Sequence, residues 1–210
     1  MVQVRPALPL DRQPLPTTGP ITWTERFTGD KLPPAWVTLH PPQSAWYSTG
    51  SRGLRLTPSS MPIGAFGTGP GQPAYVGHRL QHHAATLETT LAPFDPAINE
   101  FAGLALVQNE YGHYVLGVER DQQGLAIALY RRAGREGAKQ GDRLARIALA
   151  SADVPVSLRF RLDGPRLDAA YSISPGEWKA VATGLDASLL SADIAGGFIG
   201  NTFGPYAFRP

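Results

Sequence analysis

Glu119 and Asp121 are the carboxylate pair whose spacing could support chemistry. Two residues apart on a strand, they would face the same side, and a sandwich glycosidase needs its two carboxylates on one surface facing the sugar. Gln123 and Gly124 follow directly, which indicates that the strand is ending there. We therefore interpret Glu119 and Asp121 as residues at the end of a hairpin strand, and we assign no catalytic residue to this chain.

Three histidines, His78, His82 and His83, raise the question of a metal site. On a strand, His78 and His82 would share a face but lie about 13 Å apart, at roughly 3.3 Å per residue. One ion cannot bind both without a bulge, and no Cys or carboxylate stands beside them to complete a site. We predict surface and ladder histidines, with no metal and no other cofactor.

A loop rich in glycine and proline, residues 58–73, surrounds Phe66. Its glycines look superficially like a phosphate loop, but they do not connect an apolar strand to a helix. Nothing close in the sequence would bury Phe66, and a large apolar residue on such a loop usually meets a partner surface or a ligand. The alternative is that Phe66 folds back over a sheet edge.

Aromatic side chains are the other candidates, because a flat ring can stack on the C–H face of a sugar. Besides Phe66, Trp36 has a ring of this kind, and the candidates for stacking are Trp46, Tyr47 and Trp178. Tryptophans of sandwich proteins more often fill the core between the sheets. We expect that position for Trp46 and Trp178, with sugar stacking as the alternative.

Strands must position these residues, because strand patterns follow one another from Ile21 onward. In residues 156–163 four apolar side chains alternate with four polar ones, which is typical of a strand wet on one side. A central hairpin joins 102–107 to 114–118, and its first strand is apolar on both faces. Further strands are expected at 23–27, 46–49, 54–57, 74–80, 84–91, 125–131, 143–149, 167–173, 177–182 and 197–203. The one helical candidate is 185–190, and so many short strands predict an all-β, two-sheet antiparallel β-sandwich.

The 210-residue length suits one large all-β domain, and the absence of cysteine excludes disulfides without deciding the compartment. A net charge of +2 with scattered basic residues argues against a nucleic-acid partner. No apolar run approaches the ~18 residues of a membrane span, and no signal peptide is visible. We expect no membrane partner, and both the cytoplasm and the periplasm stay open as locations.

The N-terminal residues 1–20 are rich in proline and show no periodicity. We expect them to form an interdomain linker, with the sandwich in residues 21–210. A long Pro-rich approach to a folded domain suggests that another domain precedes it. A disordered tail is the alternative.

Four short motifs, in order, resemble those of one known domain type. They are Pro73 to His82 against A-[FL]-[VL]-x-R-R-x-Q, Ala102-Gly103-Leu104 with Gln108-Asn109-Glu110 and Tyr114 against A-G-L-x-x-x-Q-N-E…Y-Y, Tyr171-Ser172 with Gly176 and Trp178 against Y-S-x-D-G-x-x-W, and Leu190-Ser191 with residues 195–200 against L-S…A-G-G-F-T-G. Pro175 stands where the third motif has Asp. Together they resemble the C-terminal concanavalin-like β-sandwich (jelly roll) of glycoside hydrolase family 43 β-xylosidases, over about residues 23–208.

That resemblance implies a role beside a catalytic domain. In those enzymes a β-propeller carries the carboxylates that hydrolyse xylosides or arabinosides, and the sandwich packs on it and lends an aromatic side chain to the sugar pocket. The equivalent loop here would be 58–73, with Phe66 as the pocket residue flanked by Gly64 and Gly67. The implied partners are the propeller and, through the parent enzyme, a xylo-oligosaccharide or arabinoside; a homo-oligomer is a further prediction. The hypothesis is a non-catalytic accessory domain, and the alternative is an independent carbohydrate-binding module.

Overall fold

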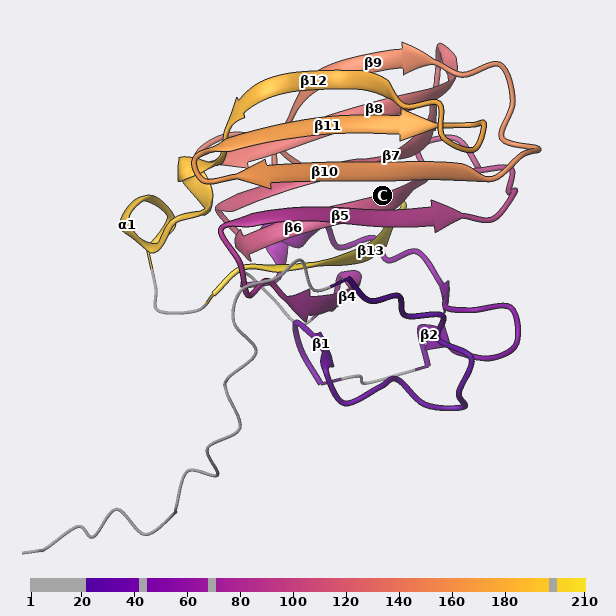
Figure 1. Ribbon diagram of the computed structural model, residues 1–210, viewed down its shortest axis with the longest axis horizontal. Coiled ribbons are helices and arrows are strands. Elements are labelled where there is room, and N and C mark those ends of the chain that lie inside the picture. Colours follow the sequence, from indigo (N-terminus) through magenta and orange to yellow (C-terminus); the bar gives the residue numbers. More distant parts are fainter. Residues whose placement is uncertain (1–21, 42–44, 68–70, 197–199) are drawn as a thin grey trace, which may run out of the picture.

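The computed structural model describes residues 22–41, 45–67, 71–196 and 200–210. Two antiparallel sheets stack face to face (Figure 1). The larger has the strand order β1-β4-β13-β6-β7-β8-β9 and the smaller the order β12-β11-β10-β5. The predicted all-β, two-sheet antiparallel sandwich is therefore confirmed, while the expected linker 1–20 lies outside the described residues.

The strands of the larger sheet are β1 (Trp36–Thr38), β4 (Ala74–Arg79), β13 (Thr202–Phe208), β6 (Phe101–Asn109), β7 (Gly112–Asp121), β8 (Gly124–Ala133) and β9 (Asp142–Ala148). Those of the smaller sheet are β12 (Lys179–Asp186), β11 (Arg166–Ser172), β10 (Val156–Asp163) and β5 (Ala84–Leu91). A short ribbon pairs β2 (Tyr47–Ser48) with β3 (Arg55–Leu56). Strands β6 and β7 form the central hairpin, in antiparallel register from Phe101 opposite Glu119 onward.

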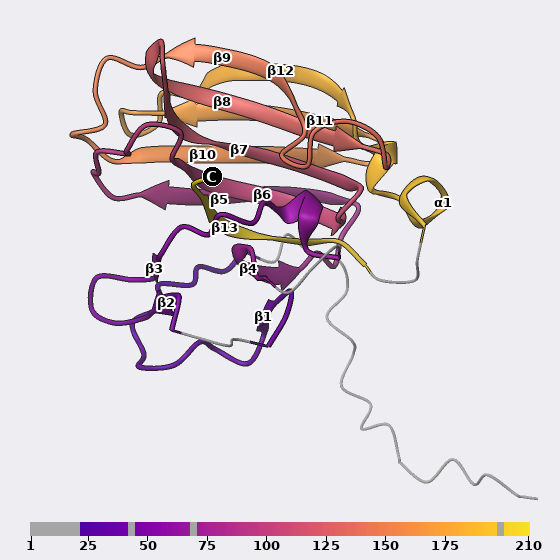
Figure 2. The same cartoon turned by 180° about the vertical axis from the view of Figure 1, so that it is seen from behind.

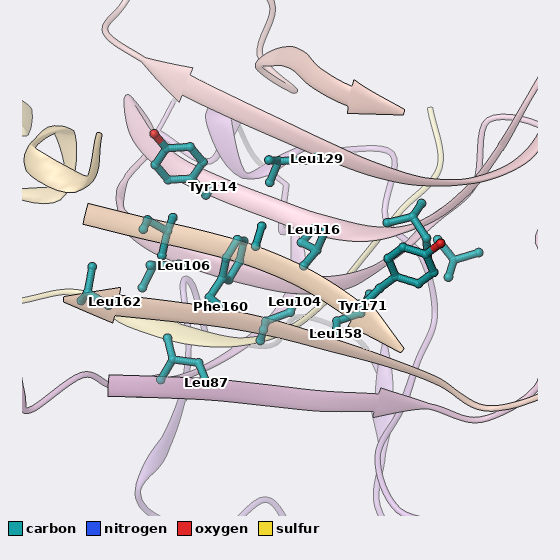
Figure 3. Close-up of a cluster of buried hydrophobic side chains, with 14 of the residues drawn as sticks. Leu87, Leu104, Leu106, Tyr114, Leu116, Leu129, Leu158, Phe160, Leu162 and Tyr171 are labelled. Atoms are coloured by element: carbon teal, nitrogen blue, oxygen red, sulfur yellow. The ribbon is translucent and has the colours of Figure 1, made fainter. Parts of the chain in front are cut away.

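The main core lies between the two sheets. Leu104 and Leu116 point inward from the larger sheet, and Leu158 and Phe160 point inward from the smaller one (Figure 3). The polar residues that alternate with them on β10 face outward, as their period of two predicts. This cluster supplies most of the apolar burial that stabilises the fold.

The opposite, outer face of the larger sheet is covered as well. A second cluster there unites Phe101, Val115, Tyr206 and Ile63, the last of which lies in the 3-10 turn η1 (Ile63–Ala65). The expectation that the first strand of the hairpin is apolar on both faces because both are covered is confirmed, and it extends to β7.

Residues 22–41 and 45–57 pack beside β4, beyond β5, where the smaller sheet does not extend (Figures 1 and 2). Trp46 packs there on Ala74 and Val76 in a third cluster. The strand expected at 23–27 is wrong, because residues 22–28 are irregular and Phe27 has a φ of 52°. Trp46 is buried as expected, but its ring lies where this N-terminal segment packs on β4 and β13, not between the two sheets.

Two other boundaries differ from the sequence expectation near the C-terminus. Strand β12 continues to Asp186, so the predicted helix at 185–190 reduces to the 3-10 turn η2 (Ala187–Leu190), followed by the short helix α1 (Ala192–Ala195). The last strand begins at Thr202 rather than at 197, and residues 197–199 lie outside the described part. Among the described residues, no helix is long and apolar enough to cross a membrane.

Candidate functional site

The loop that carries Phe66 crosses the outer face of the larger sheet instead of standing away from it. At its start, Ser59 forms a parallel bridge with Phe208, and its carbonyl accepts a hydrogen bond of 2.9 Å from the Arg209 amide. Further along, Ile63 is 1% exposed within the second cluster. The loop is therefore anchored to β13 and to the sheet before Phe66 is reached.

Phe66 closes turn η1 and is half-buried. Its amide donates to the Ile63 carbonyl at 3.3 Å, and its ring packs against the second cluster. The ring also meets the His40 ring edge-on, with 5.8 Å between the ring centroids. The ring thus packs back on the sheet through the second cluster, most of whose members lie far away from Phe66 in the sequence. Part of the ring remains accessible on the outer face.

Gly64 and Gly67 serve close approach rather than unusual backbone angles, since neither has a positive φ. A Cβ at Gly64 would overlap the carbonyl oxygen of Lys139 and lie 2.9 Å from Arg132 Cδ. A Cβ at Gly67 would lie 2.8 Å from Glu110 Oε1. These glycines thus let the loop pack against β8, the β8–β9 loop and the β6–β7 turn.

Glu119 and Asp121 do lie on one face of β7, but both are occupied. Glu119 accepts hydrogen bonds from the Tyr130 hydroxyl at 2.7 Å and from Arg143 at 3.0 Å. Asp121 accepts one from Arg143 at 2.9 Å and two from Arg146, at 3.0 and 2.9 Å. The pair is the centre of an ion-pair cluster on the outer face, beside the β9 edge.

The electrostatics of this cluster oppose acid–base chemistry. Hydrogen bonds from Arg146, then from Arg143, hold the pKa of Asp121 far below its usual range, against the opposing effect of burial. Burial and the hydrogen bond to Glu119 raise the pKa of Tyr130, which stays a neutral donor. A glycosidase acid needs a raised carboxyl pKa, and Asp121 has the reverse. Sequence reasoning missed Tyr130, Arg143 and Arg146, since only strand register brings the first two to Glu119 and the last to Asp121.

The aromatic candidates differ in exposure. Trp46 is 9% exposed and its ring meets Tyr47 edge-on at 5.0 Å. Tyr47 lines a shallow depression of about 300 Å³ together with Ala45, Ser48, Arg55 and Thr57. Trp178 lies on the outward side of the smaller sheet with the Arg159 guanidinium 3.5 Å above its ring, so its expected place in the core is wrong. The structure does not bring the three rings together with Phe66.

His78 packs among aromatic rings, with its ring centroid 4.5 Å from that of Trp23 and 5.3 Å from that of Trp36. Within the described residues, no three His, Asp or Glu side chains gather in a way that could hold a metal ion. His78 therefore contributes to packing at the β1–β4 edge of the larger sheet.

Comparisons with known proteins agree with this architecture. Residues 24–210 match the family described as the β-xylosidase C-terminal concanavalin A-like domain. Among solved structures, a GH43_12 protein retrieved from a capybara gut metagenome is similar with a TM-score of 0.76 and 27% identity, over 88% of this chain and 34% of that one. No curated protein sequence is significantly similar to the chain.

Two further solved structures share the fold. A xylan β-1,4-xylosidase from Bacillus halodurans has a TM-score of 0.76 at 21% identity, over 97% of this chain and 38% of that one. A GH43 protein from Bacillus licheniformis has a TM-score of 0.74 at 22% identity, over 92% and 37%. The chain thus spans 34–38% of the length of these three structures. On the family match over residues 24–210, the chain belongs to the β-xylosidase C-terminal concanavalin A-like domains.

Proposed function

We propose that this domain is the non-catalytic accessory part of a glycoside hydrolase of the β-xylosidase or α-L-arabinofuranosidase type. It packs on a catalytic β-propeller and lends the loop 58–73 to the sugar pocket. Family membership supports the accessory role, and so does the length of the similar structures, about two thirds of which lies outside the matched region.

The observation that carries the proposal is the presentation of Phe66. The ring is held by turn η1 on a sheet face, yet remains partly accessible. Because the fold already orders this turn, a ligand or partner that contacts the ring does not have to order a free loop, which would cost roughly 1–2 kcal/mol per residue. An aromatic ring fixed in this way suits the wall of a sugar pocket whose remaining walls come from another domain.

The alternative, an independent carbohydrate-binding module, draws its support from the depression beside Tyr47. That hollow combines one ring with hydroxyl groups and the Arg55 side chain, which are groups that suit a sugar. A binding module usually presents two or three coplanar exposed rings, whereas here Trp46 is buried and Arg159 covers one face of Trp178. The exposed rings therefore favour the accessory role.

A pair of single substitutions in the intact enzyme separates the two functions. Phe66→Ala should lower kcat/KM for xylo-oligosaccharides or aryl arabinosides, whereas Tyr47→Ala should leave it unchanged. Calorimetric titration of the isolated chain with xylo-oligosaccharides should show no binding. An unchanged kcat/KM in Phe66→Ala, together with binding by the isolated chain that Tyr47→Ala abolishes, would favour the binding module instead.

A further inference from the structure

Arg132, near the end of β8, is the largest fully buried side chain of the described residues and is 1% exposed. Its guanidinium forms no ion pair within the described part of the chain. A buried charge is strongly unfavourable unless hydrogen bonds compensate for the lost water. The partners that Arg132 does have should therefore be held firmly.

Those partners are backbone carbonyls of the β8–β9 loop. One terminal nitrogen of Arg132 donates to the Ala138 carbonyl at 2.5 Å and the other to the Arg135 carbonyl at 3.0 Å. Gly134 and Gly141, with φ of 102° and 90°, begin and end this loop in conformations that other residues rarely adopt. The loop is therefore wrapped around the guanidinium and tied to the sheet through it.

Turn η1 rests on the same assembly. The site of a Cβ at Gly64 is filled by the Lys139 carbonyl oxygen and by the Arg132 stem, so the turn packs directly on both. Phe66 follows two residues later and closes the turn. A continuous set of contacts thus runs from the Arg132 guanidinium through the β8–β9 loop and Gly64 to Phe66.

We infer that Arg132 is a positioning residue for Phe66, acting by holding the β8–β9 loop as the support of turn η1. The consequence for sugar binding rests on the proposed function, whereas the mechanical coupling does not. The neighbouring His113, opposite Arg132 on β7, is itself fully buried and hydrogen-bonded to the Asn109 carbonyl. His113 therefore does not compete with Arg132 for the Ala138 and Arg135 carbonyls of the β8–β9 loop.

Limited proteolysis of the 210-residue chain tests the coupling without sugar or propeller, so its failure is distinct from failure of the proposed function. Chymotrypsin cleavage after Phe66 reports opening of the turn, and cleavage after Phe160, in the main core, reports global unfolding. In Arg132→Met, cleavage after Phe66 should rise about tenfold while cleavage after Phe160 stays unchanged. Arg161→Met, at an exposed arginine of β10, is the matched control and should change neither.

Two results would overturn the inference: no faster cleavage after Phe66, or an equal rise at Phe66 and Phe160, which would make Arg132 a general stabiliser. If Arg132→Met does not fold, Gly64→Ala decides from the side of the turn, because the added methyl group cannot fit against the Lys139 carbonyl. Chymotrypsin cleavage after Phe66 and tryptic cleavage after Lys139 should then rise together. A rise at only one of the two sites would disprove the coupling.

Discussion

The hydroxyl group of Tyr130 donates a 2.7 Å hydrogen bond to Glu119 Oε2, diagonally across β7 and β8. Glu119 is 5% exposed, so its carboxylate depends on this hydrogen bond and on Arg143. A buried carboxylate that loses a donor is destabilised by more than the loss of an exposed hydrogen bond would cost. The hydrogen bond between Tyr130 and Glu119 therefore stabilises the packing of β7 against β8 on the outer face of the larger sheet.

Tyr130→Phe should therefore lower the free energy of unfolding by about 1.5–3 kcal/mol, the range for hydrogen bonds to charged groups. Urea denaturation measures the effect. In the double-mutant cycle with Glu119→Gln, the two losses should add up to more than the double variant shows. Strict additivity would contradict the inferred dependence of Glu119 on Tyr130.

The isolated chain should hydrolyse neither aryl xylosides nor aryl arabinosides. Both carboxylates of the cluster are held by arginine side chains, and the pKa of Asp121 lies far below that of a general acid. Release of the aryl group at the rate of the buffer blank is the expected result. Turnover that Glu119→Gln abolishes would show that the cluster is catalytic.

Stability should fall as the pH drops from about 6.5 to 4, because of His113. Burial, opposed by the hydrogen bond to Asn109 and aided by the charge of Arg132, lowers the pKa of His113 to about 4. Between about pH 6.5 and pH 4, His113 is protonated in the unfolded chain but neutral in the folded protein. The free energy of unfolding therefore rises with pH in this window, by at most about 1.4 kcal/mol per pH unit. Urea denaturation at several pH values should show this slope.

His113→Gln should flatten the slope between pH 4 and 6.5, and His82→Gln, at an exposed position, is the control. An unchanged slope in His113→Gln would assign the acid sensitivity to other groups. Below this window the contribution of Asp121 takes over.

Asp121 should make a separate contribution at lower pH. Because its pKa in the folded protein is lowered by Arg146 and Arg143, its stabilisation is present above the unfolded pKa of about 3.9 and is lost as the pH falls below it. Asp121→Asn should reduce stability at pH 7 and weaken the pH dependence below about pH 4. Equal losses at pH 7 and pH 2 would contradict this assignment.

Local patterns predicted much of the fold but little of the site. The alternation of β10 and the doubly apolar β6 follow from period-two placement, and both appear in the structure. By contrast, the burial of Phe66 comes from a cluster formed largely by strands far away in the sequence, and the partners of Glu119 come from β8 and β9. Such contacts depend on strand order and register, which alternation alone does not determine.

Tryptophan placement failed for a similar reason. Trp178 was expected in the core because large rings are usually buried there, but it precedes β12 and meets Arg159 on the outward side. The guanidinium of Arg159 covers one face of the ring. The sequence indicates that the Trp178 ring should be shielded from water, but not that the shielding side chain is Arg159 of a different strand.

The last prediction compares Phe66 with Phe160, which is fully buried between the sheets. Phe160→Ala should cost about 3–5 kcal/mol of stability, as truncation of a core phenylalanine does. Phe66→Ala removes a half-buried ring and should cost roughly half as much or less. Thermal or urea unfolding of the two variants gives this comparison.

Kinetics should rank the same two positions in the opposite order. If the proposed function holds, Phe66→Ala should reduce kcat/KM of the intact enzyme, assayed well below its unfolding transition, because the sugar would lose a ring that turn η1 holds in place. Phe160→Ala, assayed under conditions in which it remains folded, should keep kcat/KM close to that of the unsubstituted enzyme, because its ring faces only the sandwich core. A large stability loss in Phe66→Ala with unchanged kinetics would make Phe66 a packing residue of the outer sheet face, and the pocket would then have to take its aromatic wall from elsewhere.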